Sequence, residues 1–403
     1  MNEMLPPNEH DQLRESWVSR NPKKTITLFL LVVLFFSDLT ATVGYRYITK
    51  GTIAKRVSIE PDGLRTRHKI YHHDLNPNQS VPLIKWRDEN YSFFTNSLGF
   101  RDKAVRSISL DTEEPRILFM GDSFTEGAAV DYADSFVGLI DSHLGDEIDV
   151  LNAGVASYSP AIYFLKTQYL IKQIGLSFDH LVVAIDISDI IDDGEVYKIQ
   201  DEKIISNRYS HAGFRQSYLL TPLLDFLHDY TTIGRLFIHY SVKTYEMLTQ
   251  KGGKHFRTKE EQSLGAGRPE GLWTVNEFLY SDFGKAGLES SKRHLTFLND
   301  LLKDQSISMT IVVYPWPDQI LHNDLHSIQV EFWEKWAKEQ SVNFINLFPL
   351  FIKAGQQKSE LITTIKTYYF EADVHWNKKG HLLVAQKILD QLKIKKQEFL
   401  KKI

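Results

Sequence analysis

From residue 113 onward, short apolar runs alternate with longer amphipathic stretches, and this alternation is the clearest structural signal in the chain. Each apolar run is bounded by polar or turn residues, as expected of a buried strand. The runs that predict strands are 116–120, 149–152, 180–185, 309–314 and 343–347. The stretches that predict helices are 133–144, 160–174, 285–303, 325–340 and 378–397. This order predicts an α/β domain, a flavodoxin-like three-layer sandwich with a five-stranded parallel sheet and helices on both faces.

The strongest apolar stretch near the N-terminus lies within residues 25–45 and runs from Ile26 to Phe36. The wider stretch approaches the ~20 residues that a membrane-spanning helix needs. A cleaved signal peptide normally begins with a short basic segment, whereas a longer segment of mixed charge precedes this run. We therefore expect an uncleaved transmembrane signal anchor, with a cleaved signal peptide and a buried core helix as the alternatives.

The flanking charges predict the orientation of this anchor. Arg20, Lys23 and Lys24 lie just before it, which favours a cytoplasmic N-terminus. Asp38 lies inside the apolar stretch and costs about 2.5–3.5 kcal/mol if it is central in a membrane. We expect residues 1–24 to be a cytoplasmic tail. We expect the residues beyond 45 to lie outside the cytoplasm, on the periplasmic side of the inner membrane.

Two segments interrupt the pattern of strands and helices. Residues 46–112 contain turn residues without a sustained helical period, and we expect an irregular cap or N-terminal extension. Residues 195–284 are expected to be a helical insertion, able to form a lid, within a catalytic domain that spans 113–397.

Composition removes several classes of function. The net charge of −4 is too small to suggest nucleic acid as a partner. The chain has no cysteine, which excludes disulfides, cysteine nucleophiles and thiolate metal sites. His72 and His73 are adjacent but have no third spaced ligand group, so we expect no metal there.

A serine at the end of the first predicted strand points to nucleophilic chemistry. Ser123 follows an apolar run in the sequence Gly121-Asp122-Ser123, which delivers a hydroxyl to the rim of a parallel sheet. A serine hydroxyl needs a base to take its proton, and the base needs an orienting group. His375 is the candidate base and Asp373 the candidate orienting carboxylate, and both precede the last predicted helix. This order predicts a serine hydrolase or an acyl-transfer enzyme.

These motifs resemble those of the SGNH (GDSL) hydrolase family. The first block is Gly121-Asp122-Ser123, the second is Leu151-Asn-Ala-Gly154, and the last runs from Asp373 to His381. The resemblance implies a flavodoxin-like fold, ester or acyl chemistry, and neither metal nor cofactor. It also implies an oxyanion hole from the amides of Ser123 and Gly154 and from a side chain in the third block.

The sequence departs from the family pattern in two places. In the third block, Ser188 stands where the family has asparagine, and its hydroxyl offers one donor on a shorter side chain. The last block has Asp373-Val-His375, where many members have two residues between the aspartate and the histidine. The shorter form is similar to that of the alginate O-acetyltransferase branch, which acts on exported polysaccharide.

Two further sets of residues have both a functional and a structural interpretation. Trp316 and Trp376 are candidates for binding sugar rings or acyl chains, although packing beneath the site is as good an account of each. The acidic run Asp186, Asp189, Asp192 and Asp193 could hold a cation, but turn and cap roles, with Arg101 as a partner, are the simpler interpretation.

The sequence therefore predicts a serine-dependent esterase or O-acyltransferase, acting on a small acyl ester or on envelope or exported polysaccharide. It predicts membrane attachment through the N-terminal helix. The alternative is a non-catalytic envelope protein that binds glycan or serves in assembly and retains the fold. A lipid-directed esterase also fits the anchor, but no residue indicates it.

Overall fold

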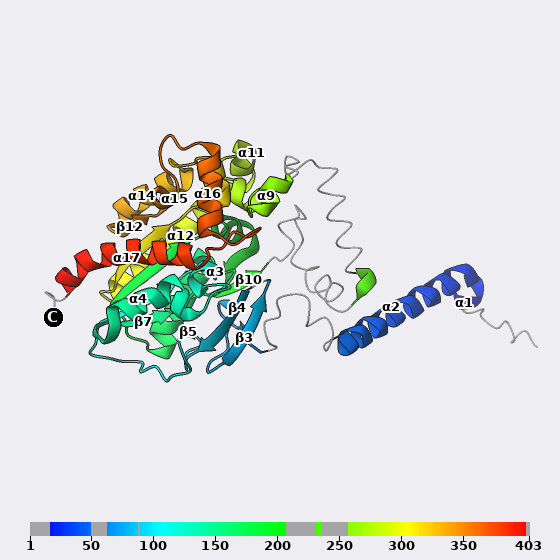
Figure 1. Ribbon diagram of the computed structural model, residues 1–403. Coiled ribbons are helices and arrows are strands. Elements are labelled where there is room, and N and C mark those ends of the chain that lie inside the picture. Colours follow the sequence, from blue (N-terminus) through cyan, green and yellow to red (C-terminus); the bar gives the residue numbers. More distant parts are fainter. Residues whose placement is uncertain (1–16, 50–62, 88, 207–230, 235–256, 400–403) are drawn as a thin grey trace, which may run out of the picture. The chain divides into compact units, whose positions relative to one another are not determined.

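A computed structural model describes residues 17–49, 63–87, 89–206, 231–234 and 257–399 (Figure 1). The chain divides into two compact units. The first comprises residues 1–55 and 217–244, and the second comprises residues 56–216 and 245–403.

The first unit is built on one long apolar helix. A short helix, α1 (Trp17–Arg20), precedes α2 (Pro22–Thr49), so helix begins within the segment expected to be a tail. Within α2, the stretch Pro22–Gly44 is long and apolar enough to cross a membrane. Its apolar side chains are exposed, as at Phe29, which is 65% exposed.

Two polar side chains of α2 contact a described piece of the predicted insertion, residues 231–234. Asp38 accepts hydrogen bonds from the backbone N–H groups of Thr232 at 3.2 Å and Ile233 at 3.0 Å. Thr42 Oγ1 accepts from the same Thr232 N–H at 3.0 Å. The Asp38 carboxylate therefore has backbone donors within its own unit. Within the predicted insertion, residues 207–230 and 235–256 lie outside the described residues. The predicted helical run 217–229 and all but residues 231–234 of the run 231–249 fall there.

The second unit contains an eight-stranded sheet with the order β12-β11-β8-β6-β7-β5-β4-β3. Strands β12 to β7 in this order run parallel, and β5, β4 and β3 continue the sheet antiparallel. The parallel strands are β6 (Arg116–Met120), β7 (Asp149–Asn152), β8 (His180–Ile185), β11 (Ser308–Val313) and β12 (Asn343–Asn346). The five predicted strands are confirmed, within one residue at each end.

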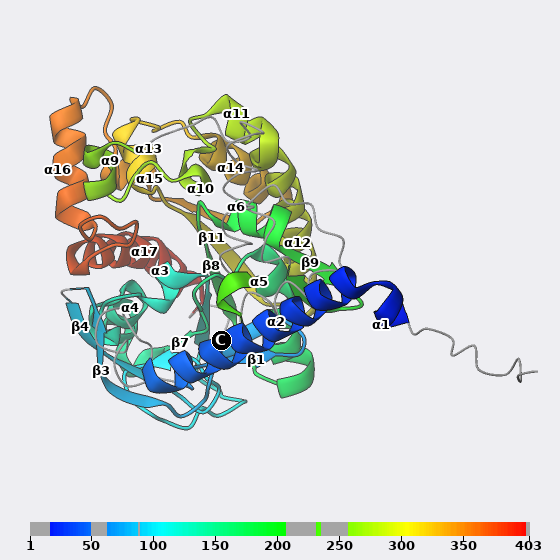
Figure 2. The ribbon, with the colours of Figure 1, turned by 90° about the vertical axis from the view of Figure 1, so that its right-hand side faces the viewer.

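Helices cover both faces of this sheet. Helices α4 and α17 pack against each other on one face, and α5 and α12 pack against each other on the opposite face (Figure 2). The helices are α3 (Ser123–Glu126), α4 (Phe136–Leu144), α5 (Pro160–Tyr169), α6 (Asp189–Ile191), α9 (Lys259–Ser263), α10 (Pro269–Leu272), α11 (Glu277–Leu279), α12 (Lys285–Asp304), α13 (Pro317–Leu321), α14 (Ile328–Gln340), α15 (Phe348–Phe351), α16 (Lys358–Tyr368) and α17 (Lys378–Phe399). The predicted three-layer sandwich is confirmed.

The extension before β6 is more regular than its sequence suggested. The expected irregular cap at 46–112 is wrong in its described part, which contains strands that enlarge the sheet or form a separate hairpin. The strands are β1 (Arg65–His68), β2 (His72–Leu75), β3 (Ser80–Trp86), β4 (Glu89–Thr95) and β5 (Arg101–Asp102). A second small hairpin, β9 (Tyr197–Gln200) with β10 (Lys203–Ser206), begins the predicted insertion. Turn residues dominated the local pattern, whereas pairing between neighbouring strands, and of β5 with β7, decided the structure.

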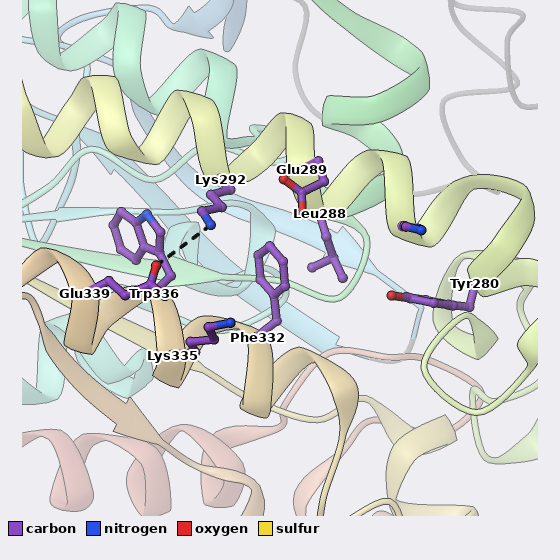
Figure 3. A pocket seen from close by; sticks show the side chains of 9 residues that line it. Tyr280, Leu288, Glu289, Lys292, Phe332, Lys335, Trp336 and Glu339 are labelled. Atoms are coloured by element: carbon purple, nitrogen blue, oxygen red, sulfur yellow. Dashed lines mark ion pairs between the residues drawn. The ribbon is translucent and has the colours of Figure 1, made fainter.

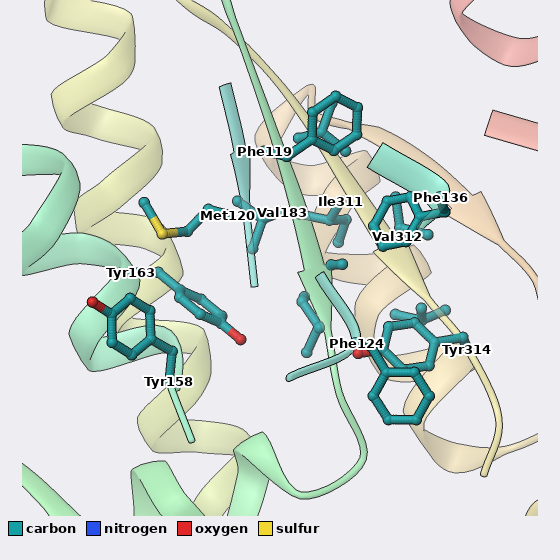
Figure 4. Close-up of a cluster of buried hydrophobic side chains, with 14 of the residues drawn as sticks. Phe119, Met120, Phe124, Phe136, Tyr158, Tyr163, Val183, Ile311, Val312 and Tyr314 are labelled. Carbon is teal, nitrogen blue, oxygen red and sulfur yellow. The ribbon is translucent and has the colours of Figure 1, made fainter. Parts of the chain in front are cut away.

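The core lies on both faces of the parallel strands. Adjacent residues of β6, Phe119 and Met120, point to opposite faces, as the pleat of a strand requires (Figure 4). Phe119 packs on Phe136 of α4, with ring centroids 5.9 Å apart. Burying a side chain of this size contributes roughly 1.5–3 kcal/mol. The sheet is therefore held rigidly between its helix layers, and its carboxyl edge is a fixed platform.

A buried ion pair joins the extension to this platform. Lys166 of α5 is fully buried, and its Nζ donates to Asp74 Oδ1 of β2 at 2.8 Å. The same ammonium donates to Tyr158 Oη and to the Ala153 carbonyl, each at 3.1 Å. Since the charge is compensated and its donors are used, the pair fixes the β1–β2 hairpin against the loop that follows β7.

We predict that Lys166→Ala lowers the free energy of unfolding by about 3–5 kcal/mol, because it leaves the Asp74 carboxylate buried without its cation. Urea unfolding of the full-length protein in detergent measures this change. Lys103→Ala is the matched control, because Lys103 pairs with Asp141 but is 62% exposed. It should cost less than about 1 kcal/mol. Equal effects of the two variants would contradict a special role for the buried pair.

Candidate active site

Ser123 lies where the central strand β6 ends and the short helix α3 begins. Asp122 caps α3 by accepting the Phe124 N–H at 2.9 Å. A Cβ at Gly121 would lie 2.1 Å from Thr125 Oγ1 and 3.1 Å from the Ala184 carbonyl oxygen, so the tight turn needs glycine. The Gly-Asp-Ser sequence thus folds into a turn that places the serine hydroxyl at the carboxyl edge of the sheet.

The structure brings Asp373 and His375 to this serine from the loop between α16 and α17. Ser123 Oγ lies 2.8 Å from His375 Nε2. His375 Nδ1 lies 2.5 Å from Asp373 Oδ1, which also accepts the His375 backbone N–H at 3.0 Å. The carboxylate fixes the proton of the neutral ring on Nδ1, and Nε2 is then free to accept the serine proton. These three side chains, predicted from distant parts of the sequence, form one chain of hydrogen bonds.

The environment of Asp373 favours its ionised form. Burial by itself would raise the pKa of Asp373, but this effect is outweighed by the hydrogen bonds and charge of His375 and by the charge of Arg87, and the pKa is lowered. Arg87 Nη2 lies 3.2 Å from Asp373 Oδ2. An ionised carboxylate can both orient the imidazole and stabilise its cation.

Two of the three expected oxyanion donors, the Gly154 amide and the Ser188 hydroxyl, already donate to acceptors within the protein. Gly154 N–H donates to Asn152 Oδ1 at 3.1 Å. Ser188 Oγ lies 2.5 Å from Asp186 Oδ2, so its hydroxyl donates to that carboxylate. Ser123 begins α3, whose first amides have no acceptor within the helix. The oxyanion roles of Gly154 and Ser188 therefore stay predictions.

Glu126, at the end of α3, connects the serine turn to its surroundings. Its carboxylate accepts both ends of the Arg65 guanidinium, at 2.7 and 2.8 Å, and the Ala156 N–H at 2.8 Å. These bonds fix the distance between α3 and the loop that carries Gly154. A Cβ at Gly154 would lie 2.6 Å from Thr125 Cβ and 3.0 Å from the Glu126 amide nitrogen, which shows how closely the two segments approach.

Three buried aspartates, Asp122, Asp186 and Asp189, form a cluster behind Ser123. Their nearest carboxylate oxygens lie within 4.8 Å of one another. Burial raises the pKa of each carboxyl, and the charge of Asp186 raises that of Asp122 further. Like charges at such distances cannot all ionise, so the cluster retains protons.

Protein donors, rather than a cation, account for most oxygens of this cluster. Asp122 accepts from Tyr314 at 3.3 Å, Asp186 from Trp316 Nε1 at 2.5 Å, and Asp189 from Tyr163 at 2.7 Å. Asp189 Oδ1 is the cluster oxygen without a hydrogen-bond partner among the described residues.

The turn and cap roles expected of the acidic run are present, since Asp186 accepts the Ser188 N–H at 3.1 Å and Asp189 accepts the Asp186 N–H at 3.0 Å. Only the expected partner, Arg101, is wrong. Arg101 is buried and donates to the backbone carbonyls of Glu126, Gly127 and Val130, at the end of the serine turn. Asp193 instead contacts His294 Nδ1 at 2.6 Å and accepts the Ala161 N–H at 2.6 Å.

The two tryptophans proposed for substrate binding belong to the interior. Trp316 is 4% exposed and donates to Asp186, and Trp376 is 1% exposed. Trp376 packs edge-on against Phe124, with ring centroids 4.7 Å apart. Neither offers a free face, because the loops that carry them fold beneath the site. Their burial favours the structural interpretation of both residues.

His381, the second histidine of the last block, is also structural. It is buried, and its Nδ1 accepts the Phe136 N–H at 3.2 Å. Burial lowers its pKa to about 3, so the ring is neutral. It stacks on Phe136 and supports the last helix rather than the reaction.

Sequence reasoning missed two residues beside the triad, Trp86 and Arg87. Both come from the end of β3, in the extension that was expected to be irregular. The Trp86 ring lies 6.3 Å from that of His375, and Arg87 contacts Asp373. No local pattern marks them, because their proximity depends on the antiparallel strands that join the sheet.

A separate cavity of about 280 Å³ lies between α12 and α14 (Figure 3). Leu288, Phe332 and Trp336 form its apolar part, and Lys292 and Glu339 pair at 3.9 Å at its side. None of the triad residues lines it. We therefore do not assign it to the reaction.

We predict that Asp189→Asn stabilises the protein, and that the gain grows as the pH rises from near 4 toward 8. A carboxyl whose pKa is raised in the folded state loses stability as it is forced to ionise, and asparagine does not ionise. The gain should therefore be larger at pH 8 than at pH 4, because burial raises the pKa of Asp189. Urea unfolding at a series of pH values measures it.

Asp131→Asn is the contrasting variant. Burial would raise the pKa of Asp131, but hydrogen bonds from Ser92 outweigh it and lower the pKa. Its replacement should therefore destabilise the protein at neutral pH and lose that effect in acid. A stability gain from Asp189→Asn that does not change with pH would contradict the protonated cluster.

Comparisons with known proteins give likenesses of structure only. No protein-family model matches the chain, and no curated protein matches it in sequence. The similar solved structures include a putative lipolytic protein of the G-D-S-L family from Desulfitobacterium hafniense (12% identity, TM-score 0.33), with 68% of this chain and 98% of that one covered. A psychrotrophic esterase from Pseudoalteromonas sp. shares 12% identity, with 70% and 97% covered and a TM-score of 0.33.

An acetylxylan esterase from Geobacillus stearothermophilus is similar at 13% identity, with 70% of this chain and 95% of that one covered and a TM-score of 0.34. Because these similarities are low, the description of the fold rests on the strand order of this chain itself. The chain has a three-layer α/β fold with a central, mostly parallel sheet, as the resemblance of its motifs to SGNH/GDSL hydrolases implied.

Proposed function

We propose that this protein is a serine-dependent esterase or O-acyltransferase. The observation that carries the proposal is the hydrogen-bond chain from Ser123 Oγ to His375 Nε2 at 2.8 Å, and from His375 Nδ1 to Asp373 Oδ1 at 2.5 Å. Acyl transfer by serine requires a hydroxyl nucleophile, a base close enough to take its proton, and a third group that orients the base.

In the proposed reaction, Ser123 Oγ attacks the ester carbonyl carbon while His375 Nε2 takes the hydroxyl proton. The carbonyl oxygen becomes an oxyanion, which the Ser123 amide stabilises. When the tetrahedral intermediate collapses, the bond to the alcohol breaks and His375 returns the proton to the leaving oxygen. Asp373 stabilises the imidazolium in both steps and keeps its own negative charge.

The acyl-enzyme is then resolved by a second attack. Water or a sugar hydroxyl gives its proton to His375 and attacks the acyl carbon; the bond to Ser123 Oγ breaks, and His375 returns the proton to Oγ. Attack by water gives hydrolysis, and attack by a sugar hydroxyl gives acyl transfer. The Gly154 amide and the Ser188 hydroxyl join the oxyanion hole if they exchange their internal acceptors, Asn152 and Asp186, for the substrate oxygen. Each donor gained in this way is worth roughly two to three orders of magnitude in rate.

The proposed substrate is an acyl ester on envelope or exported polysaccharide. The support for this choice is the short Asp373-Val-His375 block, which is similar to that of the alginate O-acetyltransferase branch. We place the enzyme on the outer side of a membrane, with α2 as its anchor. Arg20, Lys23 and Lys24 before the apolar stretch support a cytoplasmic N-terminus.

A second candidate function is non-catalytic glycan binding. The observation that favours it is that two of the three expected oxyanion donors are engaged by protein acceptors, Asn152 and Asp186. A protein of this kind would retain the triad geometry without turnover. The two candidates differ in whether Ser123 reacts covalently.

We predict that Ser123→Ala abolishes labelling by a fluorophosphonate and lowers hydrolysis of an activated acetyl ester by about 10³-fold or more, because the nucleophile is lost. The full-length protein in detergent is used for both assays. Ser359→Ala, at an exposed serine of α16, is the matched control and should match the wild type. Labelling of Ser123→Ala equal to that of the wild type would remove Ser123 from the mechanism.

A further inference from the structure

The tip of the β3–β4 hairpin reaches the loop that carries Asp373 and His375. This hairpin belongs to the antiparallel extension, since β4 pairs with β5 and β5 pairs with β7. Arg87 follows β3 and has a φ of 54°. A residue with a side chain adopts this left-handed conformation at a cost of roughly 1–2 kcal/mol, so the structure must compensate for it. The hairpin tip is therefore held in place by its contacts.

Those contacts are made by the Arg87 guanidinium on three consecutive residues. Nη1 donates to the Glu371 carbonyl at 2.6 Å, and Nη2 donates to the Ala372 carbonyl at 3.2 Å. Nη2 also lies 3.2 Å from Asp373 Oδ2. The planar guanidinium thus holds the backbone of the loop and its carboxylate together.

The two oxygens of Asp373 have separate partners. Oδ1 accepts from His375, and Oδ2 faces Arg87. A carboxylate held at both oxygens cannot rotate about its last bond without breaking one of these contacts. Arg87 therefore sets the plane in which Oδ1 meets the imidazole.

Trp86 supports the guanidinium from the same hairpin. The Arg87 guanidinium carbon lies 5.1 Å from the Trp86 ring centroid, within the range of a cation–π contact. The Trp86 ring also packs against Phe370, with centroids 5.5 Å apart. The two residues thus hold the 370–375 loop together, Arg87 through polar contacts and Trp86 through ring packing.

We propose that Arg87 is a positioning residue of the triad, which orients Asp373 through its second carboxylate oxygen and thereby aligns His375 on Ser123. The inference rests on the proposed function, because it concerns the same three side chains. It adds that the antiparallel extension, and not only the parallel strands, completes the active site.

The first test is the rate at which a fluorophosphonate labels Ser123 in Arg87→Ala, Arg87→Gln and Arg87→Lys. Labelling should slow about 10- to 100-fold in Arg87→Ala, because a small misplacement of the base is costly. Arg87→Gln, which can donate to a carbonyl but has no charge, should be almost as slow. Arg87→Lys restores the cation without the fork and should recover part of the rate. Since the Arg87 side chain is 44% exposed, millimolar guanidinium should partly rescue Arg87→Ala.

The pH profile of kcat/KM is the second readout. The charged groups that act on Asp373 are His375 and Arg87. Without the Arg87 cation the Asp373 charge is less compensated and stabilises the His375 imidazolium more strongly, so the acid limb of Arg87→Ala should move to higher pH than in the wild type. A merely structural defect would lower activity at every pH by the same factor.

The control is Lys358→Ala, which removes an exposed ion pair with Glu260 at 2.8 Å, away from the triad. It should label like the wild type, and the melting temperatures of all variants should agree within a few degrees. Wild-type labelling rates in Arg87→Ala, or an unmoved acid limb, would overturn the positioning role. Failure of the wild type itself to label would instead count against the proposed function.

Discussion

A single hydrogen bond, from Ser123 Oγ to His375 Nε2, joins the two ends of the catalytic unit. The serine follows the central strand β6, and the histidine precedes the last helix, α17. The bond exists because parallel strands and their connecting helices return both segments to the same edge of the sheet. The proposed acyl chemistry depends on the geometry of this bond.

Several layers of contacts stabilise that geometry. Gly121 allows the tight turn, Asp122 caps α3, and Arg101 satisfies carbonyls at the end of the turn. From the other direction, Arg87 holds the Asp373 loop. The buried aspartates behind Ser123 lower the stability of the folded protein at neutral pH, because burial raises the pKa of each. Buried ionisable groups with shifted pKa values are common at active sites, where a rigid scaffold holds them.

The parallel sheet and the triad could be predicted from sequence because their signals are local. Each strand is a short apolar run, and Gly121-Asp122-Ser123 and Asp373-Val-His375 are contiguous blocks beside such elements. The antiparallel strands β3 and β5 could not, because β3 is mostly exposed and β5 has only two residues, which join the sheet through β4 and the distant β7. Only the strand-like run that begins at Tyr91, within β4, was visible in the sequence. Trp316 and Trp376 were ambiguous for a related reason, since aromatic residues near a site can face either the core or the substrate.

The most direct measurement is the identification of a covalent acyl-enzyme. The full-length protein is mixed with an activated acetyl ester, quenched in acid during turnover, and digested for peptide mass spectrometry. A single acetyl group on the peptide that contains Ser123, absent when the ester is withheld, is the predicted result. Turnover with the acetyl group on a different residue, or with no acyl-enzyme even under rapid quenching, would contradict the central claim that Ser123 is the nucleophile.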